Sequence, residues 1–184
     1  FVAKDENFIN FSDSVANLLL EKDVESIEQL SELVLSDSKT VEEARTELIS
    51  KVGENISIRR FNKTSDSVNL GIYSHGFRIG SIVSLSGGSE NLAKDIAMHI
   101  AASNPICIDV NGAPSDLIER EKRIYNEQAL SSGKPPEIIE KMVQGKMSKY
   151  LKEITLLGQS FVKDPDISIE NLLKGLLISE NNSY

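Results

Sequence analysis

The side chains that could do acid–base, metal or nucleophilic chemistry are few and far apart in this sequence. His75 and His99 are its two histidines, and neither has a second histidine or a cysteine three or four residues away, as a typical helical metal site requires. Cys107 is the single cysteine and has no motif partner. We identify no catalytic constellation and no metal site, and we expect neither enzyme activity nor a bound cofactor.

Each candidate residue also has an ordinary structural explanation. A free cysteine such as Cys107 usually packs as a small apolar side chain. His99 falls on an apolar helix stripe, where a buried histidine with one satisfied ring nitrogen is typical. The segment Gly87-Gly88-Ser89 could offer backbone N–H groups to a phosphate, but it lacks the Gly-Lys-Ser/Thr ending of a phosphate loop. A tight strand-to-helix turn is the favoured interpretation.

The composition indicates an acidic protein of one or two domains. The chain has 184 residues, of which 40% are hydrophobic and 26% charged, and its formal net charge is -8. Such acidity argues against binding to a nucleic-acid backbone, which needs a basic face. No apolar run approaches the ~18 residues of a membrane helix. The single cysteine fits a reducing compartment, so we predict a cytoplasmic protein. From the acidity and the lack of a long apolar run, we expect neither nucleic-acid nor membrane partners.

Apolar spacing predicts three helices in the first third of the chain. Apolar residues recur every three or four positions from Phe8 to Leu19, which is the spacing of one helix face. Segments 26–29 and 40–43 read Ser-Ile-Glu-Gln and Thr-Val-Glu-Glu, and both are candidate capping boxes. The helix that the first box opens is predicted to continue through Val34.

A strand and a boundary are predicted next. Ile56 and Ile58 alternate with polar residues, which predicts a strand. No apolar residue occurs between Asn62 and Ser67, and we place a subdomain boundary there. The residues up to 66 hold 14 acidic and 8 basic side chains, a net charge of -6, whereas the remainder carries -2.

The second part opens with a predicted hairpin and helix. Residues 68–73 alternate in polarity, residues 79–85 form a second apolar run, and residues 74–77 lie between them as the hairpin tip. A helix is then expected to begin at Ser89 and to end at Asn104-Pro105. Two strands followed by a helix suggest helices packed over one face of a small sheet.

Residues 114–152 read as an antiparallel pair of helices. Ser115 is a candidate cap for a helix to about Leu130, and Pro136 opens another to about Leu151. Because the apolar seam is thin, we expect the pair to project as an arm that meets a partner. The predicted seam consists of Leu117, Ile118, Ile124 and Leu130 against Ile138, Ile139, Met142, Val143 and Met147.

Together these elements predict an α+β protein with two small subdomains, each with helices packed on a short antiparallel sheet. The first subdomain comprises residues 1–66. The second comprises residues 67–113 and 153–184, ends with a short helix capped by Ser168, and is interrupted by the helical arm at 114–152.

Six blocks of sequence, in the same order, resemble the bacterial type of the elongation factor Ts family. The most specific block reads Ile-Ala-Met-His-Ile-Ala-Ala-Ser-Asn-Pro, since helical periodicity alone would not demand these residues. The blocks are residues 1–5, 53–60, 75–80, 96–105, 132–135 and 158–162. They spread over nearly the whole chain.

The resemblance implies a guanine nucleotide exchange factor that binds elongation factor Tu and promotes GDP release during translation elongation. It also implies two α+β subdomains, a coiled-coil arm inserted in the second, and no nucleotide site of the factor's own. Phe1 matches the family's wedge, which enters beside the partner's magnesium and phosphate site. Val52 and Gly53 match a position that touches the GTPase domain, and His75 and Gly76 match a hairpin tip that contacts another domain.

The sequence also departs from the family pattern. The family's Thr-Asp is absent before Phe1, its N-terminal helical module is missing, and the chain stops at Tyr184, before the family's final strand. We therefore expect a portion cut at both ends, with weak exchange activity. The residues leave open a different function, namely a structural or dimerisation module that pairs with a second copy through the arm or the core.

Overall fold

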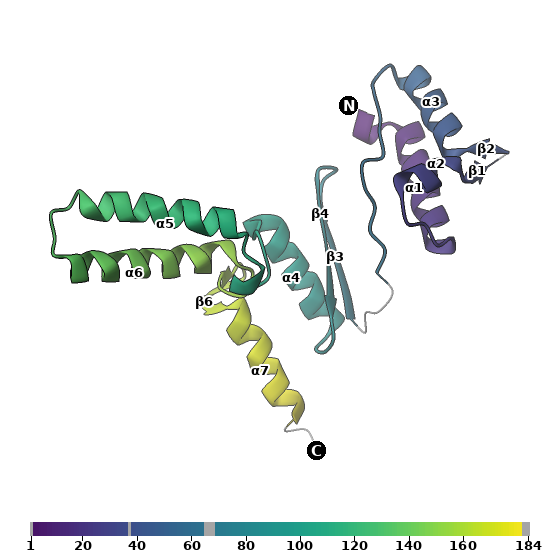
Figure 1. The fold of residues 1–184 in the computed structure, drawn as a ribbon. Coiled ribbons are helices and arrows are strands. Elements are labelled where there is room, and N and C mark those ends of the chain that lie inside the picture. Colours follow the sequence, from purple (N-terminus) through teal and green to yellow (C-terminus); the bar gives the residue numbers. More distant parts are fainter. Residues whose placement is uncertain (1, 37, 65–68, 182–184) are drawn as a thin grey trace. The chain divides into compact units, whose positions relative to one another are not determined.

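The computed structural model describes residues 2–36, 38–64 and 69–181 (Figure 1). The chain divides into two compact units, an N-terminal unit of residues 1–66 and a C-terminal unit of residues 67–184. Helices combine with short, two-stranded antiparallel sheets in the described residues of both units. This architecture confirms the predicted α+β class.

The described part of the N-terminal unit holds three α-helices whose first turns are capped by side chains. They follow a short 3-10 turn, η1 (Val2–Lys4), and are α1 (Glu6–Glu21), α2 (Ile27–Glu32) and α3 (Val41–Val52). Before α3, the hydroxyl of Thr40 accepts the Glu43 N–H at 3.2 Å and the Glu43 carboxylate accepts the Thr40 N–H at 2.8 Å, which is the predicted capping box. Before α2, the Gln29 side chain accepts from Glu25 rather than from Ser26, so the predicted box there is incomplete.

The core of the N-terminal unit forms where the three helices meet. Val15 and Leu18 of α1, Leu30 of α2 and Val41 of α3 are buried together. Because these residues recur at helical spacing, each helix turns one apolar face inward and leaves its charged face in solvent. The partly buried side chains around this cluster are Phe11, Leu19, Val24, Leu33, Leu35, Ile58 and Phe61.

The predicted continuation of α2 through Val34 is wrong. Leu33 leaves the helical conformation with φ -69° and ψ 142°, and its carbonyl accepts the Val41 N–H at 2.9 Å. Val34 instead begins β1 (Val34–Ser36), which pairs antiparallel with β2 (Lys39–Thr40). A β-branched residue fits this short ladder better than another helical turn.

The strand predicted at Ile56 and Ile58 is also wrong, because residues 54–64 have no regular secondary structure. Ile58 packs against the core, so its apolar character reflects burial. The Ile56 carbonyl accepts a hydrogen bond of 2.6 Å from the Arg45 guanidinium. The Arg45 side chain therefore satisfies a backbone carbonyl that would otherwise pair with a neighbouring strand.

The C-terminal unit begins with the predicted hairpin and helix. Strands β3 (Asn69–His75) and β4 (Ile79–Leu85) pair antiparallel, and α4 (Glu90–Ser103) packs on one face of this sheet (Figure 1). The packing is close because Gly71 has no side chain: a Cβ there would lie 2.0 Å from the carbonyl carbon of Ala93. The buried cluster between sheet and helix is Val83, Ile96 and Ala97.

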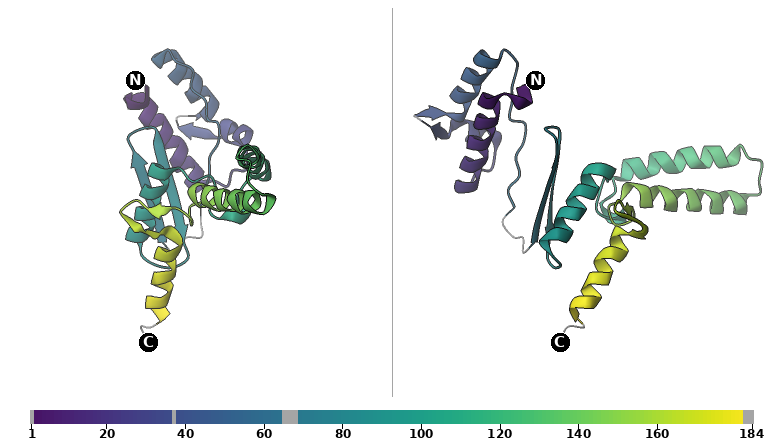
Figure 2. Two further views of the ribbon diagram at one scale, coloured as in Figure 1. Left: turned by 90° about the vertical axis from the view of Figure 1, so that its left-hand side faces the viewer. Right: turned by 180° about the vertical axis from the view of Figure 1, so that it is seen from behind.

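The arm consists of α5 (Ser115–Leu130) and α6 (Pro136–Ile154), which lie side by side in all views (Figure 2). Ser115 is the first residue of α5 and not its cap, since Pro114 precedes the helix without a side-chain cap. The predicted seam is partly wrong: Leu130 is 65% exposed, whereas its neighbour Ala129 is fully buried. One residue rotates the side chain by about 100° around a helix, which moves Leu130 off the seam.

Polar and aromatic contacts inside the arm add to its thin apolar seam. The rings of Tyr125 and Tyr150 meet edge to face at 6.4 Å. The Lys146 ammonium lies 5.4 Å from the centre of the Tyr125 ring and donates a hydrogen bond of 2.8 Å to Gln128. Burial in the seam raises the pKa of both tyrosines. These contacts fix the register of α5 against α6.

The two ends of the arm are joined at its base by backbone hydrogen bonds. The Ile106 N–H donates to Ile154 at 2.8 Å, and the Leu156 N–H donates to Cys107 at 2.8 Å. Cys107 and Thr155 form a parallel bridge, and Cys107 is half-buried. This pairing closes the core around the inserted arm.

Short elements surround the base of the arm. They are η2 (Val110–Gly112), the antiparallel pair β5 (Ser160–Phe161) and β6 (Asp164–Ser168), and α7 (Ile169–Asn181). The Ser168 hydroxyl accepts the Asn171 N–H at 3.2 Å, so Ser168 caps α7 as predicted. His99 is fully buried, and both of its ring nitrogens have partners, where the sequence predicted one.

In the part of the chain that the structure describes, no helix is both long and apolar enough to cross a membrane. The same residues contain no group of three or more histidine, cysteine, aspartate or glutamate side chains placed to hold a metal ion.

Candidate partner-binding surfaces

The first candidate surface is the C-terminal end of α3, which carries Val52 and Gly53. Gly53 ends the helix with φ +76°, a left-handed conformation that glycine adopts without strain, and its N–H donates to Ile49 at 2.8 Å. A Cβ on Gly53 would meet no atom within 4 Å. Val52 is half-buried, so this helix end presents a smooth, open surface.

An ion pair on α3 supports the segment that follows this helix end. The Arg45 guanidinium donates to the Glu42 carboxylate through two nitrogens, at 2.8 and 2.5 Å, and to the Ile56 carbonyl. The hydrogen bond from Arg45 lowers the pKa of Glu42. Arg45 thereby holds the residues after Gly53 against the helix, so that the chain leaves the helix end in a fixed direction.

The second candidate surface is the tip of the β3–β4 hairpin. His75 pairs with Ile79 at the last rung, and Gly76 makes the turn with φ +60°. His75 is exposed, and its Nδ1 atom lies 3.5 Å from the Tyr73 hydroxyl. Phe77 follows at the tip with 61% of its surface exposed. The exposed turn thus carries both an imidazole and an aromatic ring.

An apolar cavity of about 460 Å³ lies beside this tip. Tyr73, His75 and Ile79 line it from the hairpin, and Met98 lines it from α4. Its remaining walls are Ala101, Ala102 and Val162. Ile79 and Val162 are each 45% exposed, so the cavity opens onto exposed apolar surface, which is typical of interaction sites. We refer to these seven residues as the tip cavity.

The structure brings the predicted site residues together in two pairs. Val52 and Gly53 share one helix end in the N-terminal unit, and His75 and Gly76 share one turn in the C-terminal unit. The fifth, Phe1, lies outside the described residues.

Sequence reasoning missed most of the tip cavity. Tyr73, His75 and Ile79 belong to one face of the hairpin, and Met98, Ala101 and Ala102 share a helix face, so alternation and helical spacing could have indicated both walls. Val162 could not be found in this way, because it follows the arm and lies 60 or more residues along the chain from every other wall residue.

The chemistry of these surfaces is that of binding. His75 lies beside the phenol of Tyr73, and the remaining described walls of the tip cavity are the apolar side chains of Ile79, Met98, Ala101, Ala102 and Val162. The open helix end at Gly53, the apolar tip cavity and the exposed ring of Phe77 are surfaces of the kind that proteins bury against each other.

Comparisons with known proteins identify related sequences over nearly the whole chain. The family model described as Elongation factor TS matches residues 1–178. The protein named Elongation factor Ts from Nitrosomonas eutropha is 53% identical over 174 residues, which cover 95% of this chain and 59% of that protein. Its namesake from Legionella pneumophila strain Lens is 51% identical over 174 residues, covering 95% of this chain and 60% of the relative.

A third relative gives the same picture. The protein named Elongation factor Ts from Thioalkalivibrio sulfidiphilus is 51% identical over 177 residues, again 95% of this chain and 60% of the relative. The chain therefore spans about 60% of the length of the curated relatives it matches.

Proposed function

The chain belongs to the elongation factor Ts family, and from this premise we propose that it binds elongation factor Tu and promotes the release of GDP during translation elongation. The protein acts in this proposal as an exchange factor in the cytoplasm. It performs no covalent chemistry, needs no cofactor, and contacts neither nucleic acid nor membrane.

The observation that carries the proposal is the exposed apolar surface at the hairpin tip. The family resemblance assigns His75 and Gly76 to partner contact; His75 lines the tip cavity, and Gly76 follows it in the turn. Burying the exposed parts of Ile79, Val162 and Phe77 against a partner would contribute about 25 cal/mol for each Å² of apolar area. The tip cavity is the part of the binding surface that we propose to anchor the complex.

The second contact in this proposal is the end of α3. The open backbone at Gly53 lets a partner approach closely, because no side chain of Gly53 stands in the way. Val52 supplies the adjoining apolar contact. Phe1 is proposed to act as the wedge beside the partner's nucleotide site.

Thermodynamic linkage states what exchange activity requires of these contacts. A factor that weakens the binding of GDP to elongation factor Tu must itself bind more weakly when GDP is present, by the same ratio. The contacts therefore have to favour the nucleotide-free form of the partner. Contacts that are equally good in both forms would produce binding without exchange.

The test measures both halves of this linkage. Calorimetry would give the affinity of the chain for nucleotide-free and for GDP-bound elongation factor Tu, and stopped-flow fluorescence would follow release of a fluorescent GDP. We expect tighter binding to the nucleotide-free form and faster release when the chain is added. Equal affinity for both forms together with an unchanged release rate would refute the proposal.

A further inference from the structure

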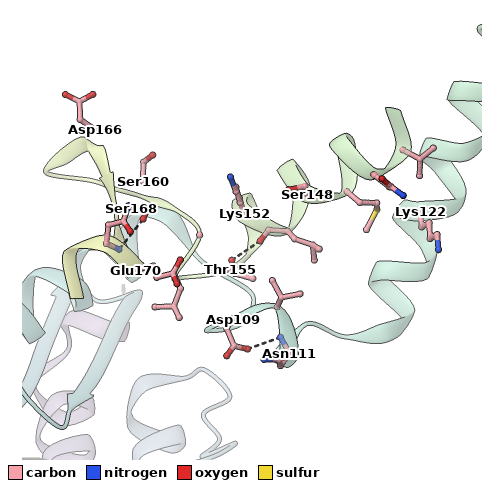
Figure 3. A pocket seen from close by; sticks show the side chains of 18 residues that line it. Asp109, Asn111, Lys122, Ser148, Lys152, Thr155, Ser160, Asp166, Ser168 and Glu170 are labelled. Carbon is pink, nitrogen blue, oxygen red and sulfur yellow. Dashed lines mark hydrogen bonds between the residues drawn. The ribbon is translucent and has the colours of Figure 1, made fainter. Parts of the chain in front are cut away.

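A single asparagine–glycine pair occurs in this chain, Asn111-Gly112. In the structure it forms the last two residues of η2, between the paired segment 106–108 and the first helix of the arm, α5. Both residues are exposed. Asn111 lines a concavity of about 1140 Å³ at the base of the arm, where Figure 3 shows it beside Asp109. The surfaces proposed to bind elongation factor Tu do not include this pair.

An asparagine followed by glycine is chemically labile in water. The backbone nitrogen of Gly112, once it has lost its proton to a solvent base, can attack the side-chain Cγ of Asn111. An N–Cγ bond forms, the Cγ–Nδ2 bond breaks, and ammonia leaves with a proton taken from solvent, which produces a five-membered succinimide. Water then opens either C–N bond of this ring to give aspartate or isoaspartate. Glycine favours the attack because it places no Cβ beside the nucleophilic nitrogen.

The hydrogen bonds of the turn oppose this attack. The Oδ1 atom of Asp109 accepts the Asn111 N–H at 2.9 Å, a bond drawn in Figure 3, and the Gly112 N–H at 3.1 Å. The Gly112 N–H also donates to the Asp109 carbonyl at 3.2 Å. The proton that the nucleophile has to lose is therefore shared between two acceptors of one residue. Its loss would also place a negative nitrogen next to a carboxylate, which is electrostatically unfavourable.

The backbone conformation of the turn adds a second restraint. The succinimide ring closes only when the Gly112 nitrogen has rotated about the Cα–C bond of Asn111 to lie over the Cβ atom. A residue in a 3-10 turn has ψ of about −20 to −30°, which holds that nitrogen away from the side chain. Asn111 therefore reacts only after η2 has opened.

Asp109 is well placed to keep the turn closed. It is half-buried, and it directly follows Ile108, whose carbonyl accepts the Leu157 N–H at 3.0 Å. Beyond Asp109, the turn has one further backbone bond, from the Ala113 N–H to the Val110 carbonyl at 3.2 Å. Local opening has to break this bond and the bonds to Asp109, so the open fraction depends on how strongly Asp109 holds the turn.

We propose that Asn111 is a deamidation site and that Asp109 sets its rate by holding the Gly112 nitrogen within η2. Modification proceeds from the fraction of molecules in which this turn is open. The product carries an additional carboxylate at the base of the arm. In its isoaspartate form it also has an additional methylene group in the backbone, between the paired segment 106–108 and α5.

The test incubates the whole chain in oxygen-18 water at neutral pH. Mass spectrometry of proteolytic fragments follows deamidation at residue 111, and the heavy oxygen excludes deamidation during digestion. We expect the folded chain to react at least about tenfold more slowly than the same chain unfolded in guanidinium chloride, because the open fraction limits the rate.

Variants of Asp109 separate its role from that of the remaining fold. Asp109→Ala should deamidate about tenfold faster than the unsubstituted chain, since it removes both side-chain hydrogen bonds of the cap. Asp109→Ser, whose hydroxyl can accept the same N–H groups, should stay within about twofold of the unsubstituted chain. Asp166→Ala is the matched control, because it removes a carboxylate that lines the same concavity, and it should leave the rate unchanged.

A second substitution identifies the nucleophile. Gly112→Ala adds a methyl group that would lie 3.4 Å from the Cys107 Cβ, an ordinary contact that the fold accommodates. Combined with Asp109→Ala, it should return the rate toward that of the unsubstituted chain. Circular dichroism establishes that each variant is folded. If Asp109→Ala does not fold, the comparison of the folded and unfolded unsubstituted chain decides the proposal together with Asp109→Ser.

Three results would overturn the proposal: equal rates in the folded and the unfolded chain, no acceleration in folded Asp109→Ala, or a rate in Asp109→Ser as fast as in the unfolded chain. Since elongation factor Tu is absent from the assay, each outcome is independent of the proposed exchange activity.

Discussion

The Nε2 atom of His99 lies 2.9 Å from the Oε1 atom of Gln159, and this contact ties α4 to a segment 60 residues further along the chain. The Nδ1 atom of the same ring accepts the Val162 N–H at 3.2 Å. This pattern assigns the Nε2–H tautomer to His99, which then donates to Gln159. His99, which belongs to the family block, is thus a buried residue that connects the segment before the arm with the segment after it.

We predict that Gln159→Leu lowers the free energy of unfolding by about 1–3 kcal/mol, because it leaves the buried Nε2–H of His99 without an acceptor. Urea denaturation measures this change. Gln144→Leu, which alters an exposed glutamine on α6, is the control and should shift stability by less than about 0.5 kcal/mol. Equal effects of the two substitutions would show that the His99 contact contributes no stability.

Gly71→Ala should destabilise the protein on the order of 3 kcal/mol, because the new methyl group would overlap the backbone of α4 at Ala93 and force sheet and helix apart. Gly80→Ala provides the matched control on the neighbouring strand, where a Cβ meets no atom within 4 Å. Thermal unfolding compares the two. A stable Gly71→Ala protein would contradict the close packing of β3 on α4.

Ile79→Ala should weaken binding to elongation factor Tu about tenfold, since Ile79 lines the tip cavity and its burial would be lost. Calorimetry with the nucleotide-free partner gives the dissociation constant.

Ile82→Ala is the control for this experiment, because Ile82 is on the same strand but points to the other face of the sheet. It should leave the affinity unchanged. If both substitutions weakened binding equally, the tip cavity would not be the contact surface.

Stability should depend on pH through Glu42. Its pKa is lowered in the folded state by the hydrogen bond from Arg45, so the ion pair contributes stability above the unfolded pKa of about 4.3 and loses it as pH falls through the folded value. The pair is solvent-screened, with half of the Glu42 side chain exposed, and its contribution is below about 1 kcal/mol.

Urea denaturation of the unsubstituted protein and of Glu42→Gln at several pH values measures this dependence. We expect a stability difference at pH 7 that decreases as the pH falls below the unfolded pKa of about 4.3. A difference that stays the same across this pH range would show that the charge of Glu42 is not its source.

Replacing residues 114–152 by a short glycine-serine linker should leave the rest of the C-terminal unit folded. The backbone pairing of residues 106–108 with residues 154–157 keeps the two ends of the arm adjacent. We expect cooperative unfolding with a Tm lowered by less than about 6 °C.

A second deletion, which also removes the paired segments 106–108 and 154–157, should abolish cooperative unfolding. Calorimetric scans of both variants decide between the two outcomes. Cooperative unfolding of the second variant would show that the pairing is dispensable.

Much of the local structure could be predicted from the sequence, because it depends on neighbours within a few residues. The capping box at Thr40 and the cap at Ser168 are such features. The β3–β4 hairpin is another, since strand alternation and the turn at Gly76 lie within one segment. Where local signals were ambiguous, as at Val34 and Ile56, a distant backbone or side-chain partner decided the conformation.

The candidate sites divide in the same way. Gly53 and Gly76 were predicted from the sequence, and each has the left-handed backbone for which glycine is suited. The tip cavity was not, because Val162 reaches it only through the pairing that folds the chain back after the arm.

The sequence by itself determined the acidic composition, the places where most helices start, the hairpin, the arm and the family. The tertiary structure alone decided that Ala129 and not Leu130 enters the arm seam, that Gln159 meets His99, and that two concave surfaces flank α4 and α6. The physical reason is one of range. Caps and turns are set by hydrogen bonds between near neighbours, whereas cavities arise where side chains from distant segments fail to fill the space between packed elements.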